Sequence, residues 1–378
     1  MRIIDFSRGV PDPRSFPSDS LRSMTATALA RDAARMLQYG SPAGYPPLRE
    51  YIASWFNCAI ANVLIGHGSL EIFKFICDAY LEPGDVVFVE RPTYDRAITT
   101  LRQHGVEIVG IDIDEHGICV DVFEHELHRH VPKLVYLIPD FHNPTGACMS
   151  LDVRRAMVRL AREHQFLIVE DGPYCCLRYT GIPIPSIRSM APELTLHLSS
   201  FTKLISPGVR TGFLVAPDEV VKRVTSVAER NYIAPCFFAQ GVVAAWCADG
   251  QLPLQLDRLR QLYRPRLDAC VQAIDDSLPG RLFTHPEGGF FVALRLGNLI
   301  EEKSLQVAAR GVGLILSSGS AFFDIDPGYQ FLRVPFCALP PGDIIEGIRR
   351  LGNVVDHLNE VGLRGKTLPL TDTKEASC

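Results

Sequence analysis

The sequence predicts an α/β protein with a large domain, in which helices cover a mixed and mostly parallel sheet, and a smaller α+β domain. Two observations lead to this prediction. Short apolar runs alternate along the chain with longer stretches of helical periodicity, which is the pattern of crossover units in a parallel sheet. The 378 residues are also enough for two domains, and 47% hydrophobic with 21% charged residues is typical of a globular protein.

The elements of the large domain follow in chain order. Five apolar runs predict buried strands, at residues 86–89, 134–138, 166–169, 195–198 and 212–215. Helical stretches such as Leu151–His164 separate them. We therefore expect residues 40–250 to form the large domain.

The remaining segments predict the small domain. Residues 252–279 have the pattern of a long amphipathic helix, and residues 288–294 and the segment around Arg333 have the pattern of strands. We expect residues 251–364 to form this domain and residues 1–39 to join it. Residues 365–378 are polar and lack periodicity, which predicts a loose tail.

Composition narrows the possible functions. The net charge of −5 does not provide the excess of positive charge that proteins binding nucleic acid or an anionic membrane usually have. The chain has no run of 18 apolar residues, and its first five residues lack the apolar region of a signal peptide. The eleven cysteines are scattered through apolar contexts, which indicates reduced thiols, and His128 and His130 lack further ligands at metal-site spacing. We expect a cytoplasmic enzyme without a metal.

The segment from Ser200 to Gly212 has the strongest chemical signature. It places the amine of Lys203 beside the hydroxyls of Ser200 and Thr202, and Arg210 follows a Pro-Gly turn. An amine can form a Schiff base with an aldehyde cofactor, and hydroxyls with a guanidinium can bind its phosphate. Taken alone, a lysine at this position is more often a solvated residue that ends a strand, and two further motifs favour the chemical role.

Two further motifs directly follow apolar runs. Asn143 lies in the turn 139–146, and Asp171 ends the next run. Ligands of open α/β sheets bind at such strand ends. A buried aspartate needs a cationic partner, for which a protonated pyridine nitrogen would serve, and Tyr174 could donate to a phenolate oxygen on the same ring. The alternatives are an ordinary turn at Asn143 and a helix cap with a packed tyrosine at Asp171.

Together, in this order and spacing, the three motifs resemble the class I/II pyridoxal-phosphate-dependent aminotransferases, the aspartate aminotransferase-like superfamily. The resemblance runs from about Asp5 to about Leu358 and is closest to the branch that holds 2-aminoadipate and kynurenine aminotransferases and the effector domains of MocR-type regulators. It implies the aspartate aminotransferase-like fold, pyridoxal 5'-phosphate (PLP) as cofactor, an amino acid and a 2-oxo acid as substrates, and a homodimer with shared active sites.

The resemblance also implies catalytic roles for individual residues. Lys203 would carry the Schiff base and then move the proton, and Asp171 would keep the ring nitrogen protonated. Asn143 and Tyr174 would hold the ring hydroxyl. Tyr94 matches an aromatic residue that stacks on the ring, although ordinary core packing is the alternative for it.

The same resemblance implies a set of phosphate ligands. They are Ser200, Thr202, Arg210 and the backbone N–H groups of Gly68, Ser69 and Leu70. That turn opens an apolar helix, and a helix N-terminus suits a dianion. Tyr39 matches a tyrosine that reaches the phosphate of the neighbouring subunit.

Two arginines are assigned to the substrate. Arg333, together with Asn143, matches the position that binds the α-carboxylate. Arg8 stands where relatives often have a small residue, on a segment that closes over the substrate, so we expect it to recognise a polar or acidic side chain. The alternative is that Arg8 points to solvent or forms a salt bridge with Asp12.

The function implied is that of a PLP-dependent aminotransferase acting through Lys203. A second hypothesis is another PLP reaction on the same scaffold, as in a lyase, cyclase, decarboxylase or oxidase, because the bond that breaks is the one that the pocket sets perpendicular to the ring. A third is a regulator domain that binds PLP without turnover.

Overall fold

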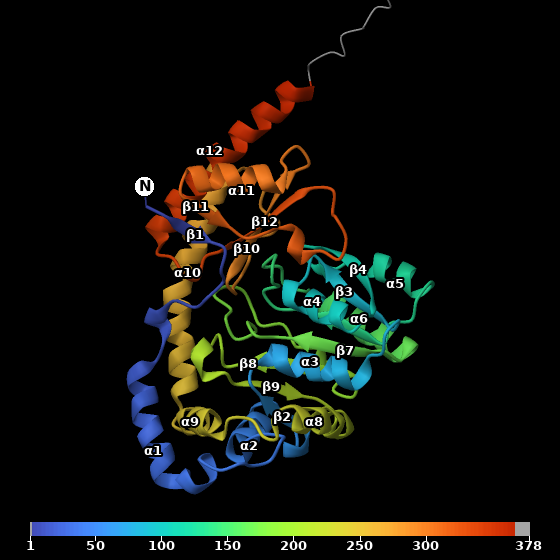
Figure 1. Cartoon of the computed structure of the whole chain (residues 1–378), viewed down its shortest axis with the longest axis vertical. Helices are drawn as coiled ribbons and strands as arrows, with labels where there is room; N and C mark the ends of the chain where they lie inside the picture. The colour runs from blue at the N-terminus through green and yellow to red at the C-terminus, as the bar shows by residue number, and fades with distance from the viewer. Residues whose placement is uncertain (1, 367–378) are drawn as a thin grey trace, which may run out of the picture.

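The computed structural model describes residues 2–366, with the backbone alone for residues 361–366 (Figure 1). A loose tail was expected from residue 365, but residues 365 and 366 belong to the last described helix, and residues 367–378 lie outside the described residues.

An eight-stranded sheet forms the centre of the larger part of the molecule. Its strand order is β2-β9-β8-β7-β6-β3-β4-β5. The strands are β2 (Val63–Gly66), β3 (Val86–Arg91), β4 (Glu107–Asp114), β5 (Gly117–Ile118), β6 (Leu134–Leu137), β7 (Leu167–Asp171), β8 (Thr195–Ser200) and β9 (Gly212–Val215). The run from β4 through β3, β6 and β7 to β8 is parallel, and β2, β5 and β9 pair antiparallel with their neighbours. The predicted mixed, mostly parallel sheet is confirmed.

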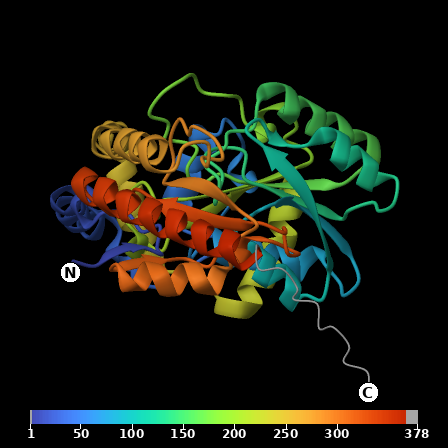
Figure 2. The same cartoon turned by 90° about the horizontal axis from the view of Figure 1, so that it is seen from above.

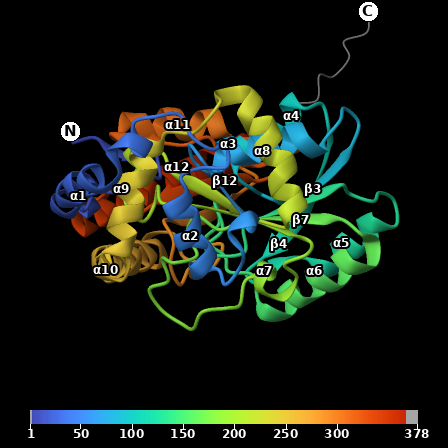
Figure 3. The ribbon, with the colours of Figure 1, turned by 90° about the horizontal axis from the view of Figure 1, so that it is seen from below.

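Helices cover both faces of this sheet (Figure 3). On one side lie α3 (Ser69–Tyr80), α4 (Asp95–Gln103) and α8 (Asp218–Tyr232), and on the other lie α5 (Val120–Leu127), α6 (Leu151–His164) and α7 (Ile187–Met190). Alternate residues of β6 enter the two cores: Leu134 and Tyr136 pack towards α3, and Val135 and Leu137 pack towards α6. Because both faces are buried, the strands have continuous apolar sequences.

The strand register brings several chain segments to one edge of the sheet. Leu137 pairs with Glu170, and Asp171 pairs with Leu198, so β6, β7 and β8 end together. Gly212, at the start of β9, pairs with Ser200 and also with Gly66, the last residue of β2. We call this side the carboxyl edge. The turns after β2 and β6, the end of β7 and the segment between β8 and β9 therefore all meet there.

The other part of the molecule is built on two small sheets. β1 (Ile4–Phe6) runs parallel to β11 (Leu314–Leu316), and β10 (Phe291–Gly297) runs antiparallel to β12 (Gln330–Pro335). The helices of this smaller part are α11 (Glu302–Gly311) and α12 (Pro341–Lys366). Figure 2 shows α12 running across the smaller part. The long helix α10 (Gln251–Ser277) leads into it from the large sheet (Figure 1). Near the start of α10, α2 (Pro46–Trp55) packs on β2, α9 (Phe237–Ala248) packs on α2, and α1 (Ser18–Met36) packs on α9. The long helix predicted for residues 252–279 is thus confirmed, with ends that differ by one or two residues.

The described residues contain no helix that is both long and apolar enough to cross a membrane. Within the same range the cysteines are free thiols, and Cys77, Cys247, Cys270 and Cys337 are buried. Burial raises the pKa of the Cys270 thiol to about 12. These residues pack as small apolar side chains.

A buried ion pair anchors the segment between β1 and α1. Asp12 is 3% exposed, and it accepts hydrogen bonds from Arg14 and from Arg266, a buried residue of α10. Arg266 also donates to the carbonyl oxygen of Cys337, which follows β12. Burial opposes ionisation of Asp12, but the two arginines outweigh it and lower the pKa of Asp12 to about 2. The N-terminal segment is thereby fixed to both α10 and the strand end of β12.

We expect Asp12→Asn to lower the free energy of unfolding at pH 7 by about 3–5 kcal/mol, because Arg266 would keep its charge in a buried site without a carboxylate. Urea unfolding of the cofactor-loaded protein measures the change. The folded pKa of Asp12, about 2, lies below its unfolded value of 3.8. The stabilisation is therefore complete above about pH 4 and is lost as the pH falls towards 2, so the two proteins should converge in acid.

Asp19→Asn is the matched control, because Asp19 pairs with Arg22 at 3.5 Å on the surface. Removing that exposed pair should cost less than about 1 kcal/mol. Equal losses in the two variants would contradict the anchoring role of Asp12.

Candidate active site

The turn between β2 and α3 forms one wall of the site. Gly68 has φ 110°, and a Cβ atom there would lie 2.9 Å from Nη2 of Arg210. A Cβ on Gly212 would lie 2.4 Å from the carbonyl carbon of Gly68. Only glycines allow this approach. It lets Arg210 donate to the carbonyl oxygen of His67 and places its guanidinium beside the N-terminus of α3.

Two hydroxyl groups line the same cavity as this guanidinium. Ser200, the last residue of β8, donates from Oγ to Oγ1 of Thr202 at 2.7 Å, and the N–H of Thr202 donates back to Ser200 Oγ at 3.0 Å. Both residues line the same cavity as Arg210. Hydroxyls, a guanidinium and a helix N-terminus together suit a phosphate group.

This cavity, the inner cavity, has a volume of about 180 Å³. Its lining residues are Gly68, Ser69, Leu70, Tyr94, Ile138, Asn143, Asp171, Pro173, Tyr174, Ser200, Thr202, Lys203 and Arg210. The structure therefore brings together every residue that the sequence assigned to the cofactor except Tyr39. Ile138 and Pro173 were not predicted, since an apolar strand end and a turn proline carry no chemical signature of their own.

Asp171 is a buried carboxylate with one unpaired oxygen. It ends β7 and is 7% exposed. Its Oδ2 accepts from the Tyr136 hydroxyl at 2.6 Å, whereas Oδ1 has no hydrogen-bond partner among the described residues. Burial raises the pKa of Asp171 to about 6, although the bond from Tyr136 acts in the opposite direction. A carboxylate in this state needs a cationic donor, and a protonated ring nitrogen would be one.

Sequence reasoning missed Tyr136. The available signal was a tyrosine within an apolar strand, because a buried phenol needs a hydrogen-bond partner. The partner could be named only once β6 and β7 were known to be neighbours, with Tyr136 opposite Val169.

Lys203 lies in an apolar setting on the same cavity. Its Nζ is 5.8 Å from the ring centre of Tyr174 and 5.7 Å from that of Phe290. Burial lowers the pKa of Lys203 and outweighs the opposite effect of Cys337, while the still smaller effects of Arg333 and Asp171 lower and raise it, respectively. A lowered pKa increases the fraction of neutral amine, which is the form that attacks an aldehyde.

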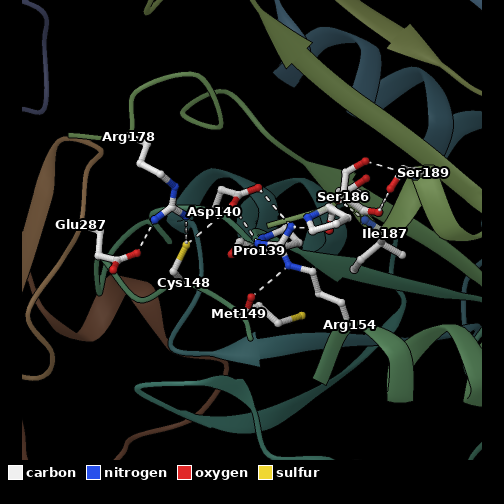
Figure 4. Close-up of polar contacts among 12 residues, drawn as sticks. Pro139, Asp140, Cys148, Met149, Arg154, Arg178, Ser186, Ile187, Ser189 and Glu287 are labelled. Carbon is white, nitrogen blue, oxygen red and sulfur yellow. Dashed lines mark hydrogen bonds and ion pairs between the residues drawn. The ribbon is translucent and has the colours of Figure 1, made fainter. Parts of the chain in front are cut away.

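A set of buried contacts holds the loop that carries Asn143 (Figure 4). Arg154, on α6, is fully buried and donates to the carboxylate of Asp140 at 2.7 Å and to the carbonyl oxygen of Met149 at 3.0 Å, near the two ends of the loop. Figure 4 shows Arg178 reaching the loop from the other side, where it contacts Cys148 Sγ at 3.1 Å. Asn143 is thereby held at the carboxyl edge with its side chain in the cavity.

A second cavity, the outer cavity, has a volume of about 520 Å³. Tyr94, Asn143, Tyr174 and Lys203 line both cavities. The outer cavity also contains both arginines that the sequence assigned to the substrate, Arg8 and Arg333. Lining residues that the sequence did not indicate include Ser7, Asp95, Arg96, Phe291, Ser317 and Phe322.

Arg333 is fixed within the outer cavity. It is 9% exposed, on β12, and its guanidinium lies 4.6 Å from the ring centre of Phe291 and 4.7 Å from that of Phe322. Nη1 donates to Oδ1 of Asn143 at 3.0 Å, Nη2 donates to the carbonyl oxygen of Ser7 at 3.3 Å, and Nε has no partner among the described residues. A planar, partly unsatisfied guanidinium held in this way suits a carboxylate.

Tyr39 is not part of either cavity lining. Its side chain is 76% exposed. The contact with a neighbouring subunit that the sequence resemblance implies therefore stays a prediction.

Comparisons with known proteins agree with this geometry. Residues 2–351 match the family described as aminotransferase class I and II. An aromatic-amino-acid aminotransferase of Thermococcus litoralis is 31% identical, over 93% of this chain and 88% of that protein. A 2-aminoadipate transaminase of Thermus thermophilus is 30% identical, over 94% and 91%.

A solved structure extends the similarity to the fold. The α-aminoadipate aminotransferase of Thermus thermophilus, complexed with N-(5'-phosphopyridoxyl)-L-leucine, superposes with a TM-score of 0.90 at 30% identity and covers 95% of this chain and 93% of its own. The fold is therefore that of the aspartate aminotransferase-like PLP enzymes.

The described residues also fit PLP itself, because the inner cavity offers an amine for the aldehyde, an unpaired carboxylate oxygen for the ring nitrogen and an anion site for the phosphate. The chain belongs to the class I and II aminotransferases, and it is a PLP-dependent enzyme that transfers an amino group between an amino acid and a 2-oxo acid.

Proposed function

We propose that amino transfer takes place where the two cavities meet, at Lys203. The observation that supports this is the position of Lys203 in the lining of both cavities, with the anion site of Arg210 in one and Arg333 in the other. A cofactor held by its phosphate and a substrate held by its carboxylate would then both reach the same amine. Proximity of this kind is a large part of enzymatic rate enhancement.

In this proposal the inner cavity holds PLP. Its phosphate is bound by Ser200, Thr202, Arg210 and the N–H groups of Gly68, Ser69 and Leu70. Asp171 Oδ1 would accept a hydrogen bond from the protonated ring nitrogen and keep that nitrogen charged, Asn143 and Tyr174 would hold the ring hydroxyl, and Tyr94 would stack on the ring. Bound PLP supplies an electron sink for the charge that is left when the α-proton is removed.

The outer cavity holds the amino acid. Arg333 binds its α-carboxylate with the help of Asn143, which its Nη1 already contacts. Lys203 removes the α-proton, a role that its lowered pKa favours because a general base works best when its pKa lies near the working pH. Aromatic amino acids and 2-aminoadipate, named for the relatives, are the first substrates to screen.

We also propose a homodimer in which Tyr39 reaches the phosphate of the neighbouring subunit. Exposed apolar side chains near Tyr39 support this proposal. Leu37 is 69% exposed and Tyr39 is 76% exposed, and the adjacent Gly40 packs against Phe237 at the start of α9, next to Phe238, which is 41% exposed. A patch of this kind is typical of an interaction surface.

The domain division proposed from the sequence is 1–39, 40–250, 251–364 and 365–378. The pairing of β1 with β11 supports joining the start of the N-terminal segment to residues 251–364, and the separation of both small sheets from the large one supports the boundary near residue 250. Helix α1, in contrast, packs on α9, which lies within residues 40–250. A cytoplasmic location is proposed with it, from the composition of the chain.

We expect Lys203→Ala to abolish turnover and to prevent the Schiff base between protein and cofactor. In the wild type, borohydride should reduce this Schiff base to a stable covalent bond. Mass spectrometry after reduction measures the bond, and circular dichroism should show an intact fold, since only the amine is lost. Lys222→Ala is the control, because Lys222 is an exposed residue that pairs with Asp218 at 2.6 Å. Normal turnover with a reducible adduct in Lys203→Ala would refute the assignment.

We expect Asp171→Ala to reduce kcat by orders of magnitude in the cofactor-loaded enzyme, where each tenfold loss corresponds to about 1.4 kcal/mol of transition-state stabilisation. Tyr136→Phe should have a smaller effect and should shift the acidic limb of the pH profile upwards, because the Tyr136 hydroxyl lowers the pKa of Asp171. Unchanged kcat and pH profile in both variants would rule out the pairing with the ring nitrogen.

We expect the protein to be a dimer at micromolar concentration and Tyr39→Phe to raise the Kd for PLP by about 10- to 100-fold, through loss of a hydrogen bond to a charged group. Sedimentation and cofactor titration measure the two quantities. Leu37→Ser, on the same exposed surface, should weaken the dimer without removing a phosphate ligand. A fully active monomer would contradict this proposal.

A further inference from the structure

Arg8 is an unpaired cation at the rim of the outer cavity. It is exposed, it lines the cavity with Lys203 and Arg333, and it forms no hydrogen bond or ion pair with another described residue. The salt bridge to Asp12 that the sequence left as an alternative is wrong, because that carboxylate is bound by Arg14 and Arg266. The guanidinium of Arg8 is therefore available to a ligand.

The backbone on both sides of Arg8 is held in place. The carbonyl oxygen of Ser7 accepts from Arg333 at 3.3 Å, and the N–H of Ser7 donates to Asp5 at 2.7 Å. On the other side, Cys337 Sγ contacts the carbonyl oxygen of Val10 at 3.2 Å. Between them Gly9 lies so close to the wall that a Cβ would be 2.1 Å from the ring of Phe291. Arg8 is thus attached to a fixed segment next to Arg333.

The charges around the outer cavity are unbalanced. Its described lining contains the basic residues Arg8, Arg96, Arg333 and Lys203, and Asp95 is the acid among them. Arg96 already lies 3.6 Å from Asp95. A substrate with a single carboxylate would neutralise Arg333 and leave Arg8 without a counter-charge.

We infer that Arg8 binds a second carboxylate, at the far end of the substrate side chain, so that the preferred substrates are acidic amino acids. This inference rests on the proposed function, in which Arg333 takes the α-carboxylate. Arg333 is buried and contacts Asn143 near Lys203, whereas Arg8 is exposed at the rim, so the two arginines can hold the two ends of one substrate. The planar fork of arginine suits a carboxylate at either end.

The test compares the cofactor-loaded wild type and Arg8→Gln on pairs of amino acids that differ in the distal group. Glutamate and glutamine have the same length, and 2-aminoadipate is compared with norleucine. We expect kcat/KM for the two acidic substrates to fall by about 10- to 100-fold, as for loss of one hydrogen bond between charged groups, and kcat/KM for the neutral ones to change by less than about 3-fold. Arg8→Lys, which keeps the charge but not the fork, should recover part of the loss.

Binding of substrate analogues gives a second measurement. Glutarate has two carboxylates and valerate has one, and neither has an amine, so calorimetric titration measures affinity without turnover. The Kd for glutarate should rise in Arg8→Gln, and the Kd for valerate should stay the same.

Arg310→Gln is the charge-matched control, because Arg310 is exposed on α11 and outside the lining of both cavities. It should leave all four amino acids unaffected. Equal losses on acidic and neutral substrates in Arg8→Gln, no loss at all, or the same selective loss in Arg310→Gln would overturn the role of Arg8. Failure of the wild type to react with any amino acid would instead overturn the proposed function on which this role rests.

Discussion

The parallel register of β6, β7 and β8 is the constraint on which the site depends. It makes these strands end together, so that the loop of Asn143, the carboxylate of Asp171 and the hydroxyl of Ser200 lie at one edge of the sheet. A slip of one residue would turn Asp171 to the other face. The antiparallel strands β2 and β9 bring the Gly68 turn and Arg210 to the same edge. A slip would also be costly to packing, because the side chains of β6 that pack towards α3 would exchange places with those that pack towards α6 and so disturb both cores.

The site concentrates groups that are unfavourable in the absence of a ligand. Burial raises the pKa of Asp171 and lowers that of Lys203, and Arg333 keeps an N–H without a partner. Each of these groups would be satisfied by a part of the cofactor or the substrate. Perturbed groups that converge on one cavity are the expected sign of a functional site. Part of the binding energy of the ligands would then come from pairing these buried charges and satisfying the unpaired hydrogen-bonding groups.

Buried ion pairs away from the chemistry position the loops. Arg154 holds the loop of Asn143 through Asp140, and Arg266 holds the N-terminal segment through Asp12. Such pairs contribute little net stability compared with apolar packing, but their loss leaves a buried charge. The main role of these ion pairs is to fix position, because each one determines where an irregular segment lies relative to the cavities. Arg8 and Arg333 owe their proximity to the second of these anchors and to the direct contact between Arg333 and Ser7.

Local pattern was sufficient to predict five of the eight strands of the large sheet, the helices near residues 151–164 and 252–279, and the chemical interest of Lys203, Asn143 and Asp171. The roles of the other predicted residues of the inner cavity came from the resemblance to the aminotransferases. Apolar runs, turn residues and a single lysine among hydroxyls are properties of short segments, and Asn143, Asp171 and Ser200 each lie at the end of a strand that periodicity indicates. The outer cavity depends on contacts between segments far apart in the chain. Arg333 forms hydrogen bonds with Asn143, 190 positions away in the sequence, and with Ser7, 326 positions away. Asp12 forms an ion pair with Arg266, 254 positions away, and none with its neighbour Arg8. Periodicity carries no information on which distant segments pack together, so the free guanidinium of Arg8 and the bond from Tyr136 to Asp171 were decided by the tertiary structure alone.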